Sequence, residues 1–174
     1  RVDVALSDKF VVHLDGTYAK TGDMDVGGYL LTPDLRATAR ASADPAVQAV
    51  ADLKGSIPNS AGRLWEVAGG AALITPDGNL GVSVSRIGNL YGVPVRYSLD
   101  PAVTAEEVRL DMHQTRADVR AEITPASGPL EAIRFRGGFA DYAHNELDAA
   151  GNIGTTFLHQ GWEGRLELVQ RDRA

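Results

Sequence analysis

The sequence predicts an all-β fold, an antiparallel up-and-down meander of about seven strands. Three observations support this prediction. Apolar and polar residues alternate in about seven stretches, as in a sheet with one apolar and one wet face. All eight prolines lie between these stretches, where they remove no ladder hydrogen bond. Short and long connections alternate along the chain, so every short turn falls at one end of the sheet.

The alternating stretches form three pairs joined by short turns, followed by one last strand. The pairs are 2–7 with 10–18, 65–73 with 80–84, and 108–123 with 133–139, and the last strand is 162–168. The short turns are 7–9, 75–78 and 124–129. The long connections fall at about 20–62, 92–105 and 147–156.

Two local features modify this simple pattern. The apolar positions of the fifth strand change parity near Gln114 and Thr115, so we expect either a bulge or the edge of an apolar band there. Within the first long connection, Asp44 can cap a helix that begins at Pro45. The sequence therefore predicts one short loop helix near 44–54, which packs within the loop.

Composition excludes several classes of protein. The 174 residues suit one domain, and 44% hydrophobic residues exclude a disordered chain. The absence of cysteine excludes disulfide frameworks, thiolate metal sites and cysteine nucleophiles. The net charge of -6, without a basic stretch, argues against a nucleic-acid partner. No apolar run approaches the roughly 18 residues of a membrane helix.

The polar face of the predicted strands separates two kinds of barrel. It carries charged residues that a soluble barrel would have to bury, at several kcal/mol each unless they are paired. In a transmembrane barrel the same residues line a watery lumen, while the apolar face meets lipid. Aromatic residues also lie at the long-loop ends of the strands, as in an interfacial girdle. They are Tyr18, Trp65, Tyr91, Phe139, Tyr142 and Trp162. We therefore expect a segment of a transmembrane β-barrel, with a soluble sandwich or barrel as the alternative.

Three runs near the end of the chain are more specific than a generic barrel. They are 133–146 (IRFRGGFADYAHNE), 154–157 (GTTF) and 161–168 (GWEGRLEL). Upstream, 57–60 (IPNS), 84–86 (VSR) and 91–94 (YGVP) complete the pattern. Together these runs resemble TonB-dependent outer-membrane receptors, most closely the zinc- and haem-type branch. The histidine-rich loop of zinc-type members has no counterpart in 95–107.

The resemblance implies that residues 1–174 form part of the barrel domain of such a receptor. The chain starts at Arg1 inside an alternating stretch, so we expect a segment of a longer protein. The implied partners are its own plug domain, the TonB complex acting through the plug, and outer-membrane lipid and lipopolysaccharide of a Gram-negative bacterium. The implied function is energy-coupled import of zinc, haem or a ferric siderophore as cargo, with no resident cofactor required. A passive porin-like or structural barrel is the alternative, and a soluble ligand-binding barrel is a third.

Two sets of residues are candidates for ligand contact. Asp111 and His113, expected on the lumenal face, and Arg134 and Arg136 form the predicted substrate-binding set. The commoner explanations are a solvated polar lining for the first two residues and cross-strand charge pairing for the two arginines. The predicted metal-capture set flanks the last long loop and comprises Asp141, His144, Glu146 and His159, for which solvated loop charges are the alternative. The sequence contains no GxSxG, HExxH or phosphate-binding glycine loop, so no enzyme activity is predicted.

Overall fold

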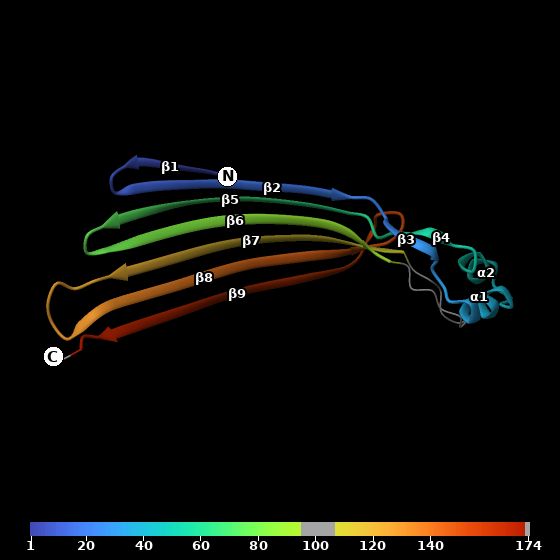
Figure 1. Cartoon of the computed structure of the whole chain (residues 1–174). Coiled ribbons are helices and arrows are strands. Elements are labelled where there is room, and N and C mark those ends of the chain that lie inside the picture. Colours follow the sequence, from blue (N-terminus) through green and yellow to red (C-terminus); the bar gives the residue numbers. More distant parts are fainter. Residues whose placement is uncertain (95–106, 173–174) are drawn as a thin grey trace.

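The computed structural model describes residues 1–94 and 107–172, and its main feature is a seven-stranded antiparallel sheet (Figure 1). The strand order is β1-β2-β5-β6-β7-β8-β9, so neighbours in the sheet follow one another along the chain. The strands are β1 Val2–Ser7, β2 Phe10–Thr21, β5 Gly62–Thr75, β6 Gly78–Val93, β7 Val108–Ile123, β8 Leu130–Leu147 and β9 Ile153–Gln170. The predicted seven-strand meander is confirmed. Within the described ranges β1 and β9 form the two edges of an open sheet.

The turns lie where the sequence places them. The β1–β2, β5–β6 and β7–β8 turns are at one end of the sheet, and the remaining connections are at the other (Figure 1). The predicted long connection at 147–156 is wrong in length, because β8 continues to Leu147 and β9 already begins at Ile153. The β5–β6 turn needs a glycine, because Gly78 has φ of 152° and the backbone of Glu122 crowds the position of a Cβ. Most of the predicted long connection at 92–105 lies outside the described residues.

Regular pairing continues through the centre of β7. Gln114 pairs with Ile87 on one side and Tyr142 on the other, and no register shift interrupts either ladder there. The predicted bulge is therefore wrong. The change in the alternation of apolar residues near Thr115 instead marks the edge of an apolar band, which was the second possibility that the sequence offered.

The sheet has two chemically different faces. Face A carries Arg116, Asp118, Arg120 and Glu122 of β7 and the residues in register with them. Face B is the opposite face. Its half near the short turns is continuously apolar on all seven strands, as strand alternation requires. Its exposed members include Val4, Leu14, Val67, Leu80, Val82, Phe135, Phe139, Trp162, Leu166 and Leu168.

The first long connection folds into a small unit of its own beyond the end of the sheet (Figure 1). It contains β3 Met24–Tyr29, α1 Pro33–Arg40, α2 Pro45–Val50 and β4 Lys54–Ile57. Ala39, Val47 and Ala51 form its buried cluster, with Leu31 packed against them. No helix in the described ranges is long and apolar enough to cross a membrane.

One of the two helices matches the prediction and the other corrects it. The expected loop helix is α2, and Asp44 caps it by accepting a hydrogen bond from the Ala46 amide at 2.8 Å. The prediction of a single helix is wrong, because α1 also forms. Its start carries the same kind of signal, with Thr32 at the N-cap and Pro33 in the first turn, although the Thr32 side chain makes no capping hydrogen bond. Arg36 secures α1 by donating to the Ala51 carbonyl at 2.8 Å and lying 3.3 Å from the centre of the Tyr29 ring.

Candidate functional site

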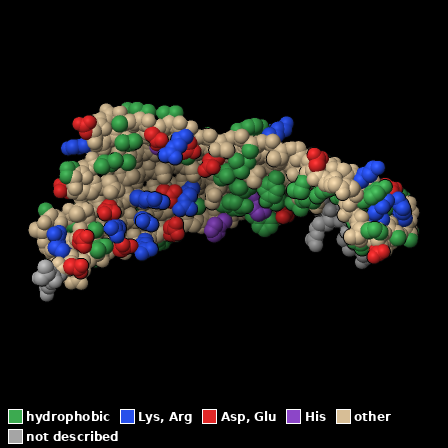
Figure 2. Space-filling view, viewed as in Figure 1, with side chains coloured by type: hydrophobic (Ala, Val, Ile, Leu, Met, Phe, Trp, Pro, Cys, Tyr) green, Lys and Arg blue, Asp and Glu red, His purple; other side chains and the backbone are tan. Residues whose placement is uncertain are grey.

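Strands β7, β8 and β9 place a group of charged side chains on face A, towards the end of the sheet that carries the short turns (Figure 2). The outermost row is Glu122, Arg134 and Glu167, which lie opposite one another on the three strands. Arg134 donates to both carboxylates, at 3.2 Å to Glu122 and 3.0 Å to Glu167. One arginine thus joins three strands, and part of the predicted cross-strand pairing between face A charges is present in this row.

A second group of ion pairs is centred on Arg116. Its guanidinium donates twice to Asp118, two residues along the same strand, with both distances 2.8 Å. It also lies 3.4 Å from a Glu163 oxygen on β9. Arg116 and Glu163 are 47% and 79% exposed, so solvent weakens the second pair in particular.

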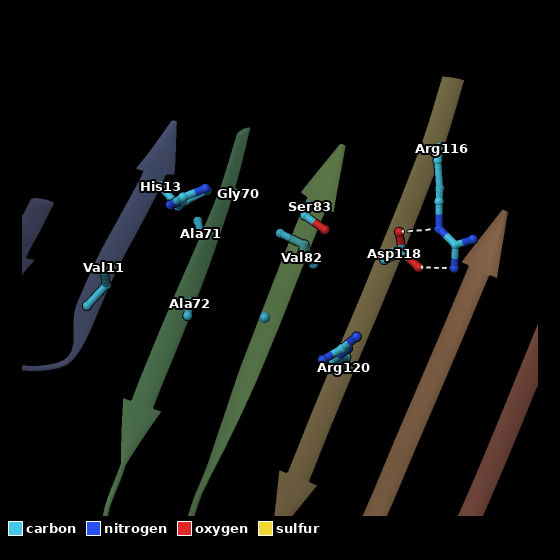
Figure 3. A pocket seen from close by; sticks show the side chains of 11 residues that line it. Val11, His13, Gly70, Ala71, Ala72, Val82, Ser83, Arg116, Asp118 and Arg120 are labelled. Carbon is cyan, nitrogen blue, oxygen red and sulfur yellow. Dashed lines mark hydrogen bonds and ion pairs between the residues drawn. The ribbon is translucent and has the colours of Figure 1, made fainter. Parts of the chain in front are cut away.

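Next to these charges face A is hollowed. A cavity of about 530 Å³ crosses β2, β5, β6 and β7. Its floor consists of small residues, among them Gly70, Ala72, Gly81 and Ser83, while longer side chains stand at the two sides (Figure 3). His13 is on one side, and Arg116, Asp118 and Arg120 are on the other. The hollow is wide because the two middle strands, β5 and β6, contribute little side-chain volume on face A there.

His13 belongs to a cluster that the sequence analysis did not identify. Its two ring nitrogens lie 2.5 Å from Asp3 and 2.5 Å from Asp15. Asp3 is directly opposite His13 on β1, and Asp15 is two residues along β2. The register of the first hairpin, which its short turn fixes, was the signal that could have placed these three residues together.

The structure separates the four predicted substrate-binding residues. Arg134 and Arg136 lie on face A, whereas Asp111 and His113 lie on face B, because unbroken alternation along β7 puts residues 111 and 116 on opposite faces. The expectation that Asp111 and His113 share the lumenal face with the arginines is therefore wrong. His113 Nε2 is 3.2 Å from Asp111, and its ring centre is 6.4 Å from that of Trp65.

The predicted metal-capture residues are also divided between the faces. Asp141 lies on face B, where its carboxylate accepts a hydrogen bond from Gln160 at 3.0 Å. His144, Glu146 and His159 lie on face A, but they occupy different rows of the ladder. In the described ranges no three His, Asp or Glu side chains come together as they would around a metal ion.

His144 is instead part of an aromatic group near the long-loop end of face A. Its ring stacks on Phe157 with centres 4.6 Å apart, and its Nδ1 is 2.9 Å from the Tyr142 hydroxyl. Met112 lies directly opposite His144 on β7. Such a surface, apolar with a few polar atoms, suits an aromatic or chelated ligand better than a bare ion.

The loop between β8 and β9 is a compact turn held by Asp148. Its carboxylate accepts from the Asn152 amide at 2.8 Å, the Ala150 amide at 2.9 Å and the Asn152 side chain at 3.0 Å. These hydrogen bonds, those from Asn152 first, hold the pKa of Asp148 below its ordinary value. The carboxylate is therefore engaged with its own loop and is not a free ligand.

Comparison with known proteins gives no family assignment: no protein-family model matches the chain, and no match to a curated protein was found.

Proposed function

We propose that this chain is part of the barrel wall of a TonB-dependent receptor that imports a metal complex across the outer membrane of a Gram-negative bacterium. The observation that carries the proposal is the apolar band on face B. It runs across all seven strands and begins at the short turns. Tyr18, Trp65, Phe139 and Trp162 mark its other border.

The height of this band fits a bilayer. On β5 it extends from Trp65 to Leu73. At about 3.3 Å per residue and a barrel tilt of about 40°, this stretch rises roughly 20 Å, and the stretch from Ile133 to Phe139 of β8 rises roughly 15 Å. The apolar band of outer-membrane barrels is roughly 25 Å tall. Beyond the border, face B carries Lys20, Arg63 and Asp111 in one register row. Polar residues at that level fit strands that continue past the bilayer into water.

The exposed area of face B argues against the soluble alternative. Trp162 is 84% exposed, Leu158 77% and Leu166 64%. A continuous apolar surface of this extent in water would promote aggregation unless a partner covered it. In a bilayer, lipid covers face B and the ion pairs of face A line an aqueous lumen.

Two observations favour an active importer over a passive porin. The first is the resemblance of 133–168 to the receptor family, in which the plug, driven by the TonB complex, opens the barrel. The second is the aromatic group of Tyr142, His144 and Phe157 at the long-loop end of face A, which offers a capture surface for a chelated or aromatic cargo such as haem or a ferric siderophore. Zinc as the cargo has less support, because the predicted ligand set is divided between the two faces.

Uptake by cells that produce the full-length protein tests this function. We expect the protein in the outer-membrane fraction, and uptake of labelled haem or ferric siderophore that disappears in a strain without TonB. His144→Ala and Phe157→Ala should reduce uptake, whereas Gly164→Ala, on the lipid-facing side of β9, should not. Uptake that persists without TonB would favour the porin-like alternative. A protein that purifies in buffer without detergent would favour the soluble one.

A further inference from the structure

Three arginines lie side by side on face A. Arg120 of β7 is directly opposite Arg136 of β8, and Arg136 is directly opposite Arg165 of β9. Like charges in directly opposed positions destabilise a sheet. The neighbouring row of Glu122, Arg134 and Glu167 alternates in sign, so the row of three arginines is an exception within one surface.

The carboxylates around this row already have other partners. Asp118 and Glu163 pair with Arg116, and Glu122 and Glu167 pair with Arg134. Arg165 also shares Glu167, at 2.9 Å. Within the described part of the chain, Arg120 and Arg136 take part in no ion pair. Five arginines thus share four carboxylates, and the surface lacks one negative charge.

There is room for an anion beside the unpaired guanidinium groups. A cavity of about 270 Å³ lies over the row and is lined by Arg120, Arg136 and Arg165. Arg116 and its two partners, Asp118 and Glu163, border the same cavity. On the β7 side, Arg120 also borders the larger hollow of face A. The planar guanidinium group matches a carboxylate in a two-point hydrogen-bonding geometry.

We propose that Arg120 and Arg136, with Arg165 beside them, form a binding site for a single carboxylate on the inner wall of the barrel. The missing single charge favours a carboxylate over a doubly charged phosphate. The flanking Asp118, Glu163, Glu122 and Glu167 repel larger polyanions and limit the site to one small group. The carboxylate comes either from a small molecule in the lumen or from a side chain of another segment of the same protein. The site is independent of which cargo is transported.

The side-chain signals of the arginines test this site directly. The full-length protein is labelled with ¹⁵N-arginine, and the Nε–H signals of residues 120, 134 and 136 are assigned from Arg→Lys variants. Sodium propionate is the monocarboxylate probe and sodium chloride controls for ionic strength. If the site is free, we expect propionate to shift the Arg120 and Arg136 signals saturably. Arg134 is the matched control, because it is already paired on both sides.

The outcomes separate the two sources of the carboxylate. Signals that move with propionate, and whose response weakens in the Arg120→Gln and Arg136→Gln variants, support a site open to small molecules. Signals already at the position of a carboxylate-bonded guanidinium, and insensitive to propionate, support an internal carboxylate. Signals at the free position that do not respond to propionate would overturn the proposal. None of these NMR signals depends on uptake or on TonB. The carboxylate site can therefore be overturned while the transport function stands, and the transport function can be overturned while the carboxylate site stands.

Discussion

At the scale of single residues, two geometries account for most of the ion pairs of face A, with Arg116–Glu163 as an exception. Arg116 and Asp118 pair two residues apart on one strand, whereas Arg134 pairs with residues directly opposite it on both neighbouring strands. Only the second kind connects strands. We therefore expect cross-strand pairs to contribute more to sheet stability than pairs along a strand.

Arg134→Gln tests the cross-strand contribution. The variant loses two ion pairs of a side chain that is 42% exposed, at 3.2 and 3.0 Å. Solvent screens ion pairs that are this exposed, so the free energy of unfolding should fall measurably but modestly. Urea unfolding of the full-length protein in lipid vesicles measures this change. Arg165→Gln is the control, since among the described residues its one ion pair runs along β9 and the side chain is 72% exposed. An equal loss in both variants would contradict the proposed difference.

Asp148 gives a pH-dependent prediction. Hydrogen bonds lower its pKa below the ordinary 3.8, so the ionised form stabilises the turn of 148–152 above pH 3.8, and this stabilisation is lost as the pH falls through the lowered pKa. Asp148→Ala should therefore speed amide exchange at Ala150 and Asn152 near neutral pH. As the pH falls below 3.8 the exchange rates of wild type and variant, corrected for intrinsic pH effects, should converge. A pH-independent difference would show that charge is not the cause.

At the scale of elements, the strands of the large sheet were predictable, whereas only α2 of the inserted unit was. Period-two alternation and turn residues such as Pro76-Asp77-Gly78 report directly on a half-buried strand. In contrast, β3, β4 and α1 lie within the segment 20–62, where the strands are short and no alternation is long enough to detect. Their stability comes from contacts distant in sequence, such as the Leu30 amide donating to the Leu53 carbonyl at 3.1 Å.

The candidate site was predictable only in part, for a related reason. Alternation correctly placed Arg134 and Arg136 on one face. It misplaced Asp111 and His113, because the apolar stretch of β7 changes face near Thr115 while the backbone continues without a bulge. The pattern of apolar residues identifies the apolar face of the sheet only inside the band. Outside the band both faces carry polar residues, so the pattern does not tell which face a residue belongs to.

The pairing of β5 with β6 depends on a close approach that only glycine permits. Trp65 lies directly opposite Gly88, and a Cβ at Gly88 would overlap the indole ring. Gly88→Ala should therefore displace Trp65 and lower the free energy of unfolding by about 1–3 kcal/mol, as overpacking does. Gly164→Ala is the matched control on the same face, because nothing lies within 4 Å of its Cβ position. Urea unfolding with tryptophan fluorescence follows both variants, and equal stabilities would contradict the close approach.

At the scale of the whole molecule, the two ends of the sheet differ in structure and composition. The short turns and the charged rows of face A lie towards one end of the sheet, while the aromatic group of His144 and the folded insert lie towards the other (Figures 1 and 2). In the proposed receptor the insert therefore faces the cell exterior. Within the described ranges the two sheet edges, β1 and β9, present unpaired backbone groups, which in the proposed receptor would pair with neighbouring strands.

Lysine substitutions at two adjacent residues of β6 test whether face B contacts lipid, because the two side chains point to opposite faces of the sheet. Val82 lies in the apolar band of face B and is 53% exposed, whereas Ser83 lines the hollow of face A. If face B meets lipid, Val82→Lys places a charge near the middle of the bilayer and should lower the free energy of unfolding in vesicles by about 2–4 kcal/mol. It should also deplete the full-length protein from the outer membrane. Ser83→Lys should change neither quantity much, because its ammonium group enters the aqueous hollow beside Asp118.

If face B met water instead, Val82→Lys would be an ordinary surface substitution within about 0.5 kcal/mol of wild type. Similar stabilities for the two lysine variants would therefore remove the membrane assignment while leaving the seven-stranded sheet intact.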